Sequence, residues 1–401
     1  MEEETLNIRM PVIFDKSIAH CETHAHQPYA SSTFNNSDEI RISVQHQDLC
    51  LLPSRSSLHV YGKLVKKDGS TVTASTALVN NAICHLFEEI RYEMNAIEID
   101  RNKNVGLTSL MKGYLSLTPG QRALMENAGW ITEQSKLTDV AGYFDVSIPL
   151  SMILGFAEDY RKIVVNAKHE LILTRAKSDA NAIVQTASEE YKVVIQNLEW
   201  LMPYVRVSDR RKIELLKFIE KDAPISMSFR TWELYEYPLL PTISKHVWTV
   251  KTSTQLEKSR YVVLGFQTNR KNKNDKNASH VDHCNVRDVK LFLNSQCYPY
   301  GSLNLDIARN LFALLYEMYA NFQASYYGKD LEPLLKRNPP LPLIVINCSK
   351  QNESLKFGLV DIRHEFEAEK NFPAETSAFC LILHDRIVEY NTISGGVKKL
   401  V

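Results

Sequence analysis

Short stretches in which apolar and polar residues alternate one by one recur along the whole 401-residue chain. In DEIRISVQ, which begins at Asp38, the apolar residues Ile40, Ile42 and Val44 are separated by polar ones. A period of two is that of a β-strand with one buried and one solvated face, so we expect the first strand to begin at Asp38. Comparable strands are predicted at residues 57–65, 86–100, 168–176, 191–207, 225–237, 246–252, 260–268, 286–295, 341–348, 360–368 and 377–391.

Two segments break the alternation with helical spacing. Ser208 or Asp209 can cap a helix that continues to Lys221, and this helix is the best candidate for a domain boundary. A second helix is predicted from Leu305, on the spacing of Ile307, Leu311, Leu314, Leu315 and Met318. Long helical periodicity is otherwise scarce in the first half of the chain. Because domains of 100 to 200 residues are typical, the length favours two of them.

The two halves resemble each other in order. IRYEMNAIEI from Ile90 matches VKLFLNSQCY from Val289, and each runs into an asparagine, Asn95 or Asn294, where a tight turn between strands is predicted. The pair His169-Glu170 likewise matches His364-Glu365, and each pair precedes the last long strand of its half. A repeat of nearly 200 residues indicates a duplicated domain. Many short strands in each copy favour a β-sandwich or barrel over an α/β sheet.

The order of the segments resembles the double jelly-roll major capsid protein family of eukaryotic DNA viruses, including Polinton or adintovirus-like proteins and their copies in invertebrate genomes. The resemblance rests on segments such as LFEEIRYEMNAIEID, FDVSIPLSMILGF, FRTWELYEYPLLP, VRDVKLFLNSQCYPYG and TSAFCLILHDRIVEYN, and it runs from Ala30 to Asn391. It implies an all-β chain of two tandem eight-stranded jelly rolls, with a connecting helix and short helices in loops. The expected division is an N-terminal arm (1–36), a first jelly roll (37–207), a linker helix (208–222) and a second jelly roll (223–401).

The same resemblance implies a structural role. Three chains would form a homotrimer with a pseudo-hexagonal outline, and these capsomers would assemble an icosahedral shell around a DNA genome. The implied partners are neighbouring capsomers, penton and minor capsid proteins, and packaged DNA without sequence-specific contact. The implied location is the virion, after synthesis in the host cytoplasm and with nuclear assembly as one option.

The composition excludes several other classes of protein. Lysine plus arginine and aspartate plus glutamate both number 47, so no overall charge attracts a polyanion. The seven cysteines are odd in number and form no C-x-x-C pair, which suits a reducing compartment. The acidic start MEEETLNIRM is not that of an export signal, and no apolar run approaches the roughly 20 residues of a membrane span. Phosphate-binding glycine loops and a G-x-S-x-G elbow are absent from the sequence, so we expect neither enzyme nor cofactor.

One segment concentrates metal-binding residue types. HCETHAH contains His20, Cys21, His24 and His26, ligands that suit zinc or copper. It lies in the predicted polar arm and lacks a second set of ligands, so no metal is predicted there. An arm that docks under the shell or onto a neighbouring subunit is the preferred interpretation.

A second cluster combines His280, His283 and Cys284 with the basic text TNRKNKNDKNASH. Contact with nucleic acid is one interpretation, and a solvated loop tip is the simpler one. The His-Glu pairs lack the second histidine of a zinc-protease motif, since Leu173 and Ala368 occupy its place, and in a strand the two side chains point to opposite faces.

Aromatic residues at Trp232, Tyr235 and Tyr237 and at Tyr298 and Tyr300 could stack on bases or sugars, but core and subunit contacts are the expected use. The text NPPLPL, residues 338–343, could be a partner ligand or could straighten the approach to a strand. Two other functions stay open: a host-resident binding protein derived from a capsid gene, and a carbohydrate-binding, lectin-like β-sandwich.

Overall fold

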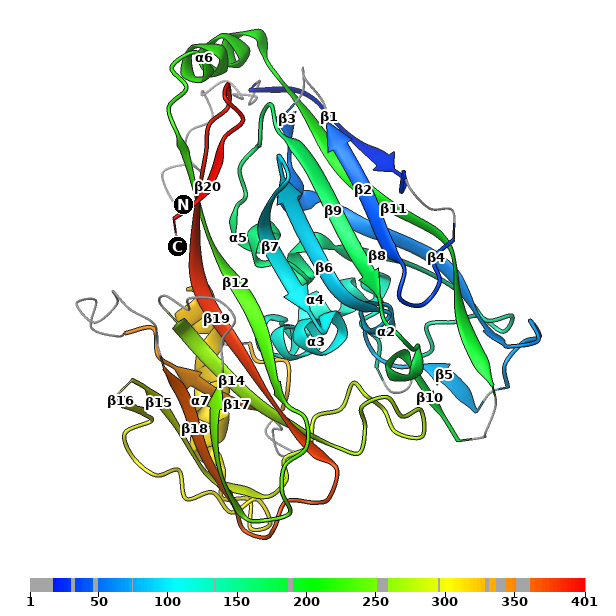
Figure 1. Cartoon of the computed structure of the whole chain (residues 1–401), viewed down its shortest axis with the longest axis vertical. Helices are drawn as coiled ribbons and strands as arrows, with labels where there is room; N and C mark the ends of the chain where they lie inside the picture. The colour runs from blue at the N-terminus through cyan, green and yellow to red at the C-terminus, as the bar shows by residue number, and fades with distance from the viewer. Residues whose placement is uncertain are drawn as a thin grey trace, which may run out of the picture.

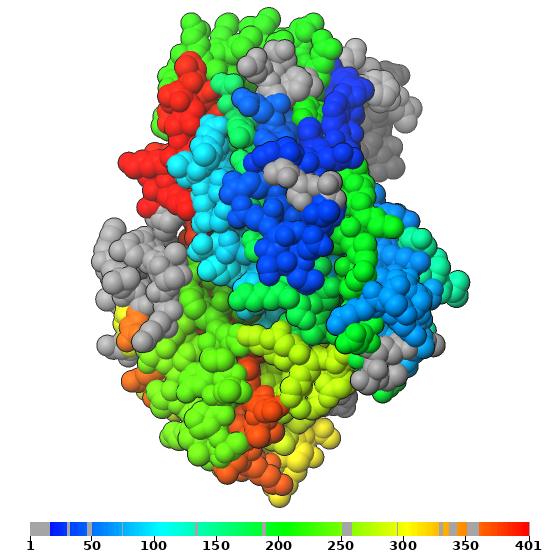
Figure 2. Space-filling view, turned by 45° about the vertical axis from the view of Figure 1, so that its right-hand side comes forward, coloured from blue at the N-terminus to red at the C-terminus, as the bar shows by residue number. Residues whose placement is uncertain are grey.

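Two antiparallel β-sandwiches follow one another along the chain and are stacked along the long axis of the molecule (Figure 1). The structure, a computed structural model, describes residues 17–29, 33–45, 50–73, 75–132, 135–186, 190–250, 259–294, 296–328, 332–336, 343–350 and 361–400. The space-filling view shows the C-terminal end of the chain, in red, beside the first sandwich rather than the second (Figure 2).

The first sandwich consists of two main sheets. One has the order β1 (Ile18–His26), β11 (Tyr191–Val207), β4 (Ser57–Lys66) and β8 (Tyr143–Pro149), with β3 (Cys50–Leu51) beside β11. The facing sheet has the order β2 (Glu39–Gln45), β9 (Lys168–Arg175), β6 (Phe87–Met94) and β7 (Ile97–Lys103). A small separate pair joins β5 (Thr76–Leu78) to β10 (Ile183–Gln185).

The second sandwich repeats this plan. One sheet has the order β12 (Ile225–Tyr237), β19 (Thr376–Tyr390), β14 (Ser259–Thr268) and β17 (Leu343–Asn347), with β20 (Val397–Lys399) beside β19. The facing sheet has the order β13 (Lys245–Val250), β18 (Ile362–Ala368), β15 (Val286–Leu293) and β16 (Gln296–Tyr298).

The two sandwiches have the same topology. When the eight main strands of each half are counted in chain order, one sheet runs first, eighth, third, sixth and the other second, seventh, fourth, fifth. All strand pairs in these sheets are antiparallel, and the last strand of each half lies between its first and third strands. This order is that of a jelly roll, in which two sheets wrap around one core. The predictions of an all-β fold and of two tandem eight-stranded jelly rolls are confirmed.

The first strand begins earlier than predicted. Ile18–His26, in the segment assigned to an arm, forms β1 and pairs with β11 from Ile18 opposite Val207 to His26 opposite Trp200. Nearly all of its side chains are exposed, so the strand has no alternation of apolar and polar residues that could reveal it. Main-chain pairing holds β1 in place, and the placement of the first strand at Asp38 is wrong.

Helices and short 3-10 turns lie in the connections. They are η1 (Pro53–Arg55), α2 (Ala82–His85), α3 (Val105–Ser116), α4 (Pro119–Leu124), η2 (Met125–Ala128), η3 (Leu150–Met152), α5 (Gly155–Asp159), η4 (Ala180–Ala182), α6 (Asp209–Ile219) and α7 (Ala313–Tyr327). The predicted helix between the two halves is confirmed as α6. In the part of the chain that the structure describes, no helix is both long and apolar enough to cross a membrane.

Two helices depart from the prediction. The helix α3 was missed because it is buried almost all round, which removes the polar stripe that marks an amphipathic helix. The helix predicted from Leu305 begins only at Ala313. Before it, Asp306 and Leu311 pair across a tight turn in which Asn310 has a positive φ of 59°, and this turn cannot continue a helix.

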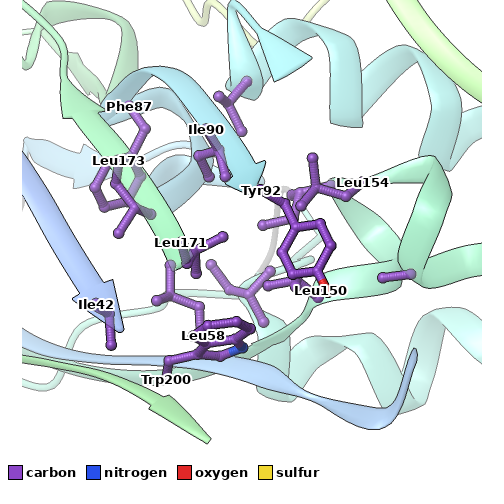
Figure 3. Close-up of a cluster of buried hydrophobic side chains, with 14 of the residues drawn as sticks. Ile42, Leu58, Phe87, Ile90, Tyr92, Leu150, Leu154, Leu171, Leu173 and Trp200 are labelled. Carbon is purple, nitrogen blue, oxygen red and sulfur yellow. The ribbon is translucent and has the colours of Figure 1, made fainter. Parts of the chain in front are cut away.

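The first core lies between the two sheets of the first jelly roll. Trp200 on β11 and Leu58 on β4 face Ile42, Tyr92 and Leu171 on the opposite sheet (Figure 3). Met227, Phe229, Val388 and Tyr390, at the ends of β12 and β19, belong to the same cluster. The two longest strands of the second half thus help to close the core of the first.

The second and third cores share one sheet. The inner face of the β12-β19-β14-β17 sheet builds the second core, and its outer face packs on α3 and α7 to form the third. Along β19, Cys380 and Ile382 belong to the second core while Phe379, Leu381 and Leu383 belong to the third. The second jelly roll is therefore joined to the first through a continuous apolar layer.

The duplicated asparagines have the same conformation and the same partners. Asn95 and Asn294 have φ values of 49° and 53° and lie at the turn after the fourth strand of each half. The Asn95 N–H donates to Lys168 O at 2.9 Å, and Lys168 N–H donates back to Asn95 Oδ1 at 2.8 Å. Asn294 and Asp361 exchange the same two bonds at 2.9 Å each. Each asparagine thus connects its turn to the start of the seventh strand.

The duplicated histidines are buried and face the cores. His169 shares a 2.6 Å hydrogen bond with the Tyr92 hydroxyl, and His364 lies 3.2 Å from Cys380 Sγ. Burial lowers the pKa of His169 to about 3 and that of His364 to about 4. The adjacent Glu170 points away and accepts from the Tyr29 hydroxyl at 2.8 Å, as expected for alternate faces of a strand.

Replacement of Asn294 by valine is expected to lower the free energy of unfolding by about 2–3 kcal/mol, because a β-branched residue resists a positive φ and the acceptor for Asp361 N–H is lost. Asn294→Asp keeps an acceptor oxygen and should cost less than about 1 kcal/mol. Urea unfolding curves and soluble yield of the two variants are the measurements. Equal losses for the two variants would contradict the role of this turn.

Acidification is expected to destabilise the protein through the two buried histidines. Their pKa values in the folded state lie below the ordinary value of 6.5, so between pH 6.5 and about 4 the unfolded chain binds protons that the folded chain does not. Stability is therefore complete above pH 6.5 and falls by about 1.4 kcal/mol per pH unit for each histidine. Urea unfolding between pH 7 and 5 should show a shallower dependence for His364→Gln. A slope identical to that of the unchanged protein would exclude His364 as the cause.

Candidate functional site

The histidine-rich segment forms an exposed strip on the edge strand β1. The Glu22 carboxylate lies between two imidazoles, 3.1 Å from His20 Nε2 and 2.7 Å from His24 Nε2, and these hydrogen bonds lower the pKa of Glu22. His26 Nε2 lies 3.0 Å from the Tyr204 hydroxyl. Successive side chains of a strand point to opposite faces, so Cys21 points away from the face that carries His20 and Glu22.

The four predicted metal-binding candidates are therefore not brought together as one ligand set. Within the described residues, no group of three or more His, Cys, Asp or Glu side chains is placed to hold a metal ion. The same holds for the second cluster: His283 accepts from Asn285 N–H at 3.1 Å, and Cys284 Sγ lies 3.8 Å from Thr268 Oγ1. His283 and Cys284 thus have separate partners and do not form one ligand set.

The basic loop after β14 forms ion pairs with other residues and is not simply a solvated tip. Arg270 makes a two-pronged ion pair with Asp282, at 2.9 and 2.7 Å, so its charge is already compensated. Lys271 pairs with Glu236 at 2.6 Å, and Lys273 pairs with Glu375 at 2.8 Å. The interpretation of this loop as a free solvated tip is wrong.

The same loop reaches the first jelly roll. Asn272 N–H donates to Asn181 Oδ1 at 2.6 Å, and Gln185 N–H donates to Asn274 O at 2.7 Å. Ser279 Oγ donates to the carbonyl of Asn80. A loop of the second jelly roll is thus fixed to the first by hydrogen bonds of its main chain and side chains. The polar groups that form these bonds are not available to bind a ligand.

Lys112 on α3 carries a buried charge where the two jelly rolls meet. Its side chain is 3% exposed, and Nζ donates to Glu158 at 3.0 Å, to Ser116 Oγ at 2.7 Å and to the Tyr327 hydroxyl at 2.7 Å. Nζ also lies 4.5 Å from the ring centre of Trp232. Burial lowers the pKa of Lys112, and the carboxylate of Glu158 opposes that effect.

A second ion pair lies beside the first. Arg230 on β12 binds both carboxylate oxygens of Asp159 on α5, at 2.6 and 2.8 Å, and donates to Tyr326 O at 2.7 Å. Its guanidinium lies 3.5 Å from the ring centre of Tyr326. At Gly155 a Cβ atom would stand 1.8 Å from Arg230 O, so only glycine allows α5 to approach β12 this closely.

Lys112, Glu158 and Asp159 come from the first jelly roll, and Arg230 and Tyr327 from the second. The Arg230–Asp159 pair and the hydrogen bond from Lys112 to Tyr327 therefore connect the two jelly rolls, whereas the Lys112–Glu158 pair lies within the first. All three donors of the ammonium group are used, and burial raises the pKa of Tyr327 well above its usual value. The cluster therefore offers neither a free base nor an activated nucleophile, and its chemistry is that of a structural junction.

Sequence reasoning missed this junction. The available signal was Lys112 itself, a single charge in the otherwise uncharged run VGLTSLMKGYLSL. Of the predicted aromatic residues, Trp232 lies in the core between the jelly rolls, whereas Tyr300 is 97% exposed. The proline-rich segment NPPLPL lies outside the described residues except for Leu343, the first residue of β17.

Solved structures show the same fold over almost the whole chain. A capsid chain of the virus PBCV-1 matches with a TM-score of 0.62 at 10% identity, covering 98% of this chain and 99% of that one. The major capsid protein of Faustovirus has a TM-score of 0.60 at 8% identity, covering 97% and 93%. That of mavirus has a TM-score of 0.58 at 10% identity, covering 98% and 92%.

No curated protein matches the chain in sequence. A family model described as the double jelly roll-like domain matches residues 76–388, from the start of β5 to a point just before the end of β19, which is well over half of the chain. This range contains most of the first jelly roll and nearly all of the second. The chain belongs to the double jelly roll-like domain family.

Proposed function

We propose that the protein is a major capsid protein, the structural subunit of a viral shell. The observation that carries the proposal is the end-to-end similarity to capsid chains, 98% of this chain against 99% of the PBCV-1 capsid chain, with the same strand order in both halves. The site chemistry supports a structural rather than an enzymatic role, because Lys112 is paired with Glu158 and Arg230 is paired with Asp159 across the junction of the two jelly rolls.

We further propose that three chains form a trimer. Two similar blocks in each chain give six blocks in a trimer, so a closed three-fold interface yields a nearly hexagonal tile. Such tiles can cover an icosahedral shell around DNA, with contacts to neighbouring capsomers, penton and minor capsid proteins, and with DNA contacted without sequence specificity. The proposed division is an N-terminal segment, a first jelly roll, the helix α6 and a second jelly roll, and the proposed location is the virion capsid.

Tiling requires a fixed angle between the two blocks of one chain. Apolar burial on both faces of the β12-β19-β14-β17 sheet holds the blocks together, and the Arg230–Asp159 pair and the Lys112–Tyr327 hydrogen bond are directional contacts that define their orientation. A host-resident protein derived from a capsid gene would have the same fold. The assembly state of the purified protein separates the two functions.

The purified protein is expected to be a trimer, with three times the 45.9 kDa mass of the chain. Light scattering coupled to size-exclusion chromatography gives the mass, and negative-stain microscopy should show particles of hexagonal outline or closed shells. A monomer that persists at micromolar concentration and above would contradict the capsid proposal and favour the host-resident alternative.

Lys112→Met is expected to lower the free energy of unfolding by about 3–5 kcal/mol, because it leaves the carboxylate of Glu158 at a buried site without its cation. The double variant Lys112→Met/Glu158→Gln removes both charges and should be more stable than the single one. Lys103→Met is the matched control, since that side chain is 57% exposed and lies 3.9 Å from Glu89. Chemical unfolding of all three variants is the measurement, and a single variant as stable as the control would refute the role of the pair.

A further inference from the structure

A cleft of about 1040 Å³ opens beside the junction. Its lining combines apolar side chains, such as Leu52, Leu117, Leu124 and Met152, with hydroxyl and amide groups, among them those of Ser54, Thr118, Gln121, Ser151 and Gln323. Ile18 and the exposed Cys21 of β1 are also among the lining residues.

The buried ion pair of the first jelly roll borders the cleft. Lys112 and Glu158 are among its lining residues and compensate each other, so they add no net charge to it. Trp232, which is 2% exposed, lines the cleft as well.

The rim of the cleft carries uncompensated positive charge. Arg55 and Arg161 are both exposed and line the cleft, and within the described part of the chain neither forms an ion pair. Arg161 Nε donates only to the carbonyl of Glu158, at 3.2 Å. Glu332 is the one carboxylate besides Glu158 among the residues that line it. Three cations against two carboxylates favour an anionic occupant.

We propose that this cleft binds an acidic peptide segment with apolar side chains, and that residues 1–16 of this protein supply it. MEEETLNIRMPVIFDK contains three consecutive glutamates for the rim arginines and the apolar run MPVIF for the walls. The segment continues directly into Ser17 and Ile18, so it is attached to the edge of the cleft.

The geometry of attachment makes this occupant reachable. Phe14 lies four residues before Ile18, a span of at most about 14 Å when extended. Covalent attachment also gives the segment a high effective concentration at the cleft, within one chain or between chains of an assembly. A long-chain carboxylate is the competing occupant, but a lining that combines hydroxyl and amide groups with apolar side chains suits a peptide backbone better than an acyl chain.

Site-specific cross-linking in the full chain tests the proposal. Phe14→p-benzoylphenylalanine is irradiated, and the cross-linked peptides are identified by mass spectrometry. We expect capture of cleft residues such as Leu124, Met125 or Met152. Cross-links between chains on a denaturing gel would identify a neighbouring copy as the donor of the segment, and cross-links within one chain would identify the same copy.

Charge reversal at the rim provides the matched comparison. Arg55→Glu/Arg161→Glu should reduce the cross-linking yield by about fivefold or more, because both exposed charges would repel the glutamates. Lys162→Glu changes the same charge next to Arg161, at a residue that does not line the cleft, and should leave the yield unchanged. Melting curves of all variants report whether they fold.

Three outcomes would overturn the proposal: no cross-link, cross-links that map outside the cleft, or a yield that both charge variants change equally. Native mass spectrometry that finds a bound long-chain carboxylate, without any cross-link to the cleft, would assign the cleft to a lipid instead. None of these outcomes bears on trimer formation, which is measured separately by mass and particle shape.

Discussion

The structure depends on one sheet that is buried on both faces. Strands β12, β19, β14 and β17 form one wall of the second jelly roll, and their outer face is covered by α7 and by α3 of the first. Sheets with one wet face alternate apolar and polar residues, whereas this sheet needs apolar side chains on both sides. The run AFCLIL of β19 meets that requirement, with Cys380 and Ile382 on one side and Phe379 and Leu381 on the other. The two halves therefore form one folded unit.

Apolar burial and polar pairing contribute differently to this unit. Each fully buried large apolar side chain contributes roughly 1.5–3 kcal/mol, and the layer between the jelly rolls contains many of them. A buried ion pair contributes little net free energy, because desolvation of both charges offsets their attraction. The Lys112 and Arg230 pairs therefore add little to how strongly the blocks adhere. The Arg230–Asp159 pair and the Lys112–Tyr327 hydrogen bond restrict the geometry instead, since another angle between the blocks would separate these partners.

The sequence allowed the strand pattern and the duplication to be predicted, and for a physical reason. Alternation arises wherever a strand has one dry and one wet face, as in DEIRISVQ and VRDVKLFL, and the paired asparagines at 95 and 294 mark turns that require a positive φ. Elements whose faces do not differ in burial could not be predicted from the sequence. Strand β1 is exposed nearly throughout, and α3 is buried nearly throughout, so neither has a periodic pattern. The junction was missed because its residues are far apart in sequence, and only the fold brings Lys112 to Tyr327.

The exposed edge strand β1 and the cleft beside it both affect how this chain can associate with other chains. An unpaired strand edge invites uncontrolled pairing with other chains, and natural proteins protect such edges or use them. Here β1 has polar histidine and glutamate side chains on one face, held in place by Glu22, while its other face borders the cleft beside Arg55. A segment that enters the cleft would cover this second face without extending the sheet. In the proposed capsid subunit, such cover would let lateral contacts between copies proceed through rigid blocks rather than through an open edge.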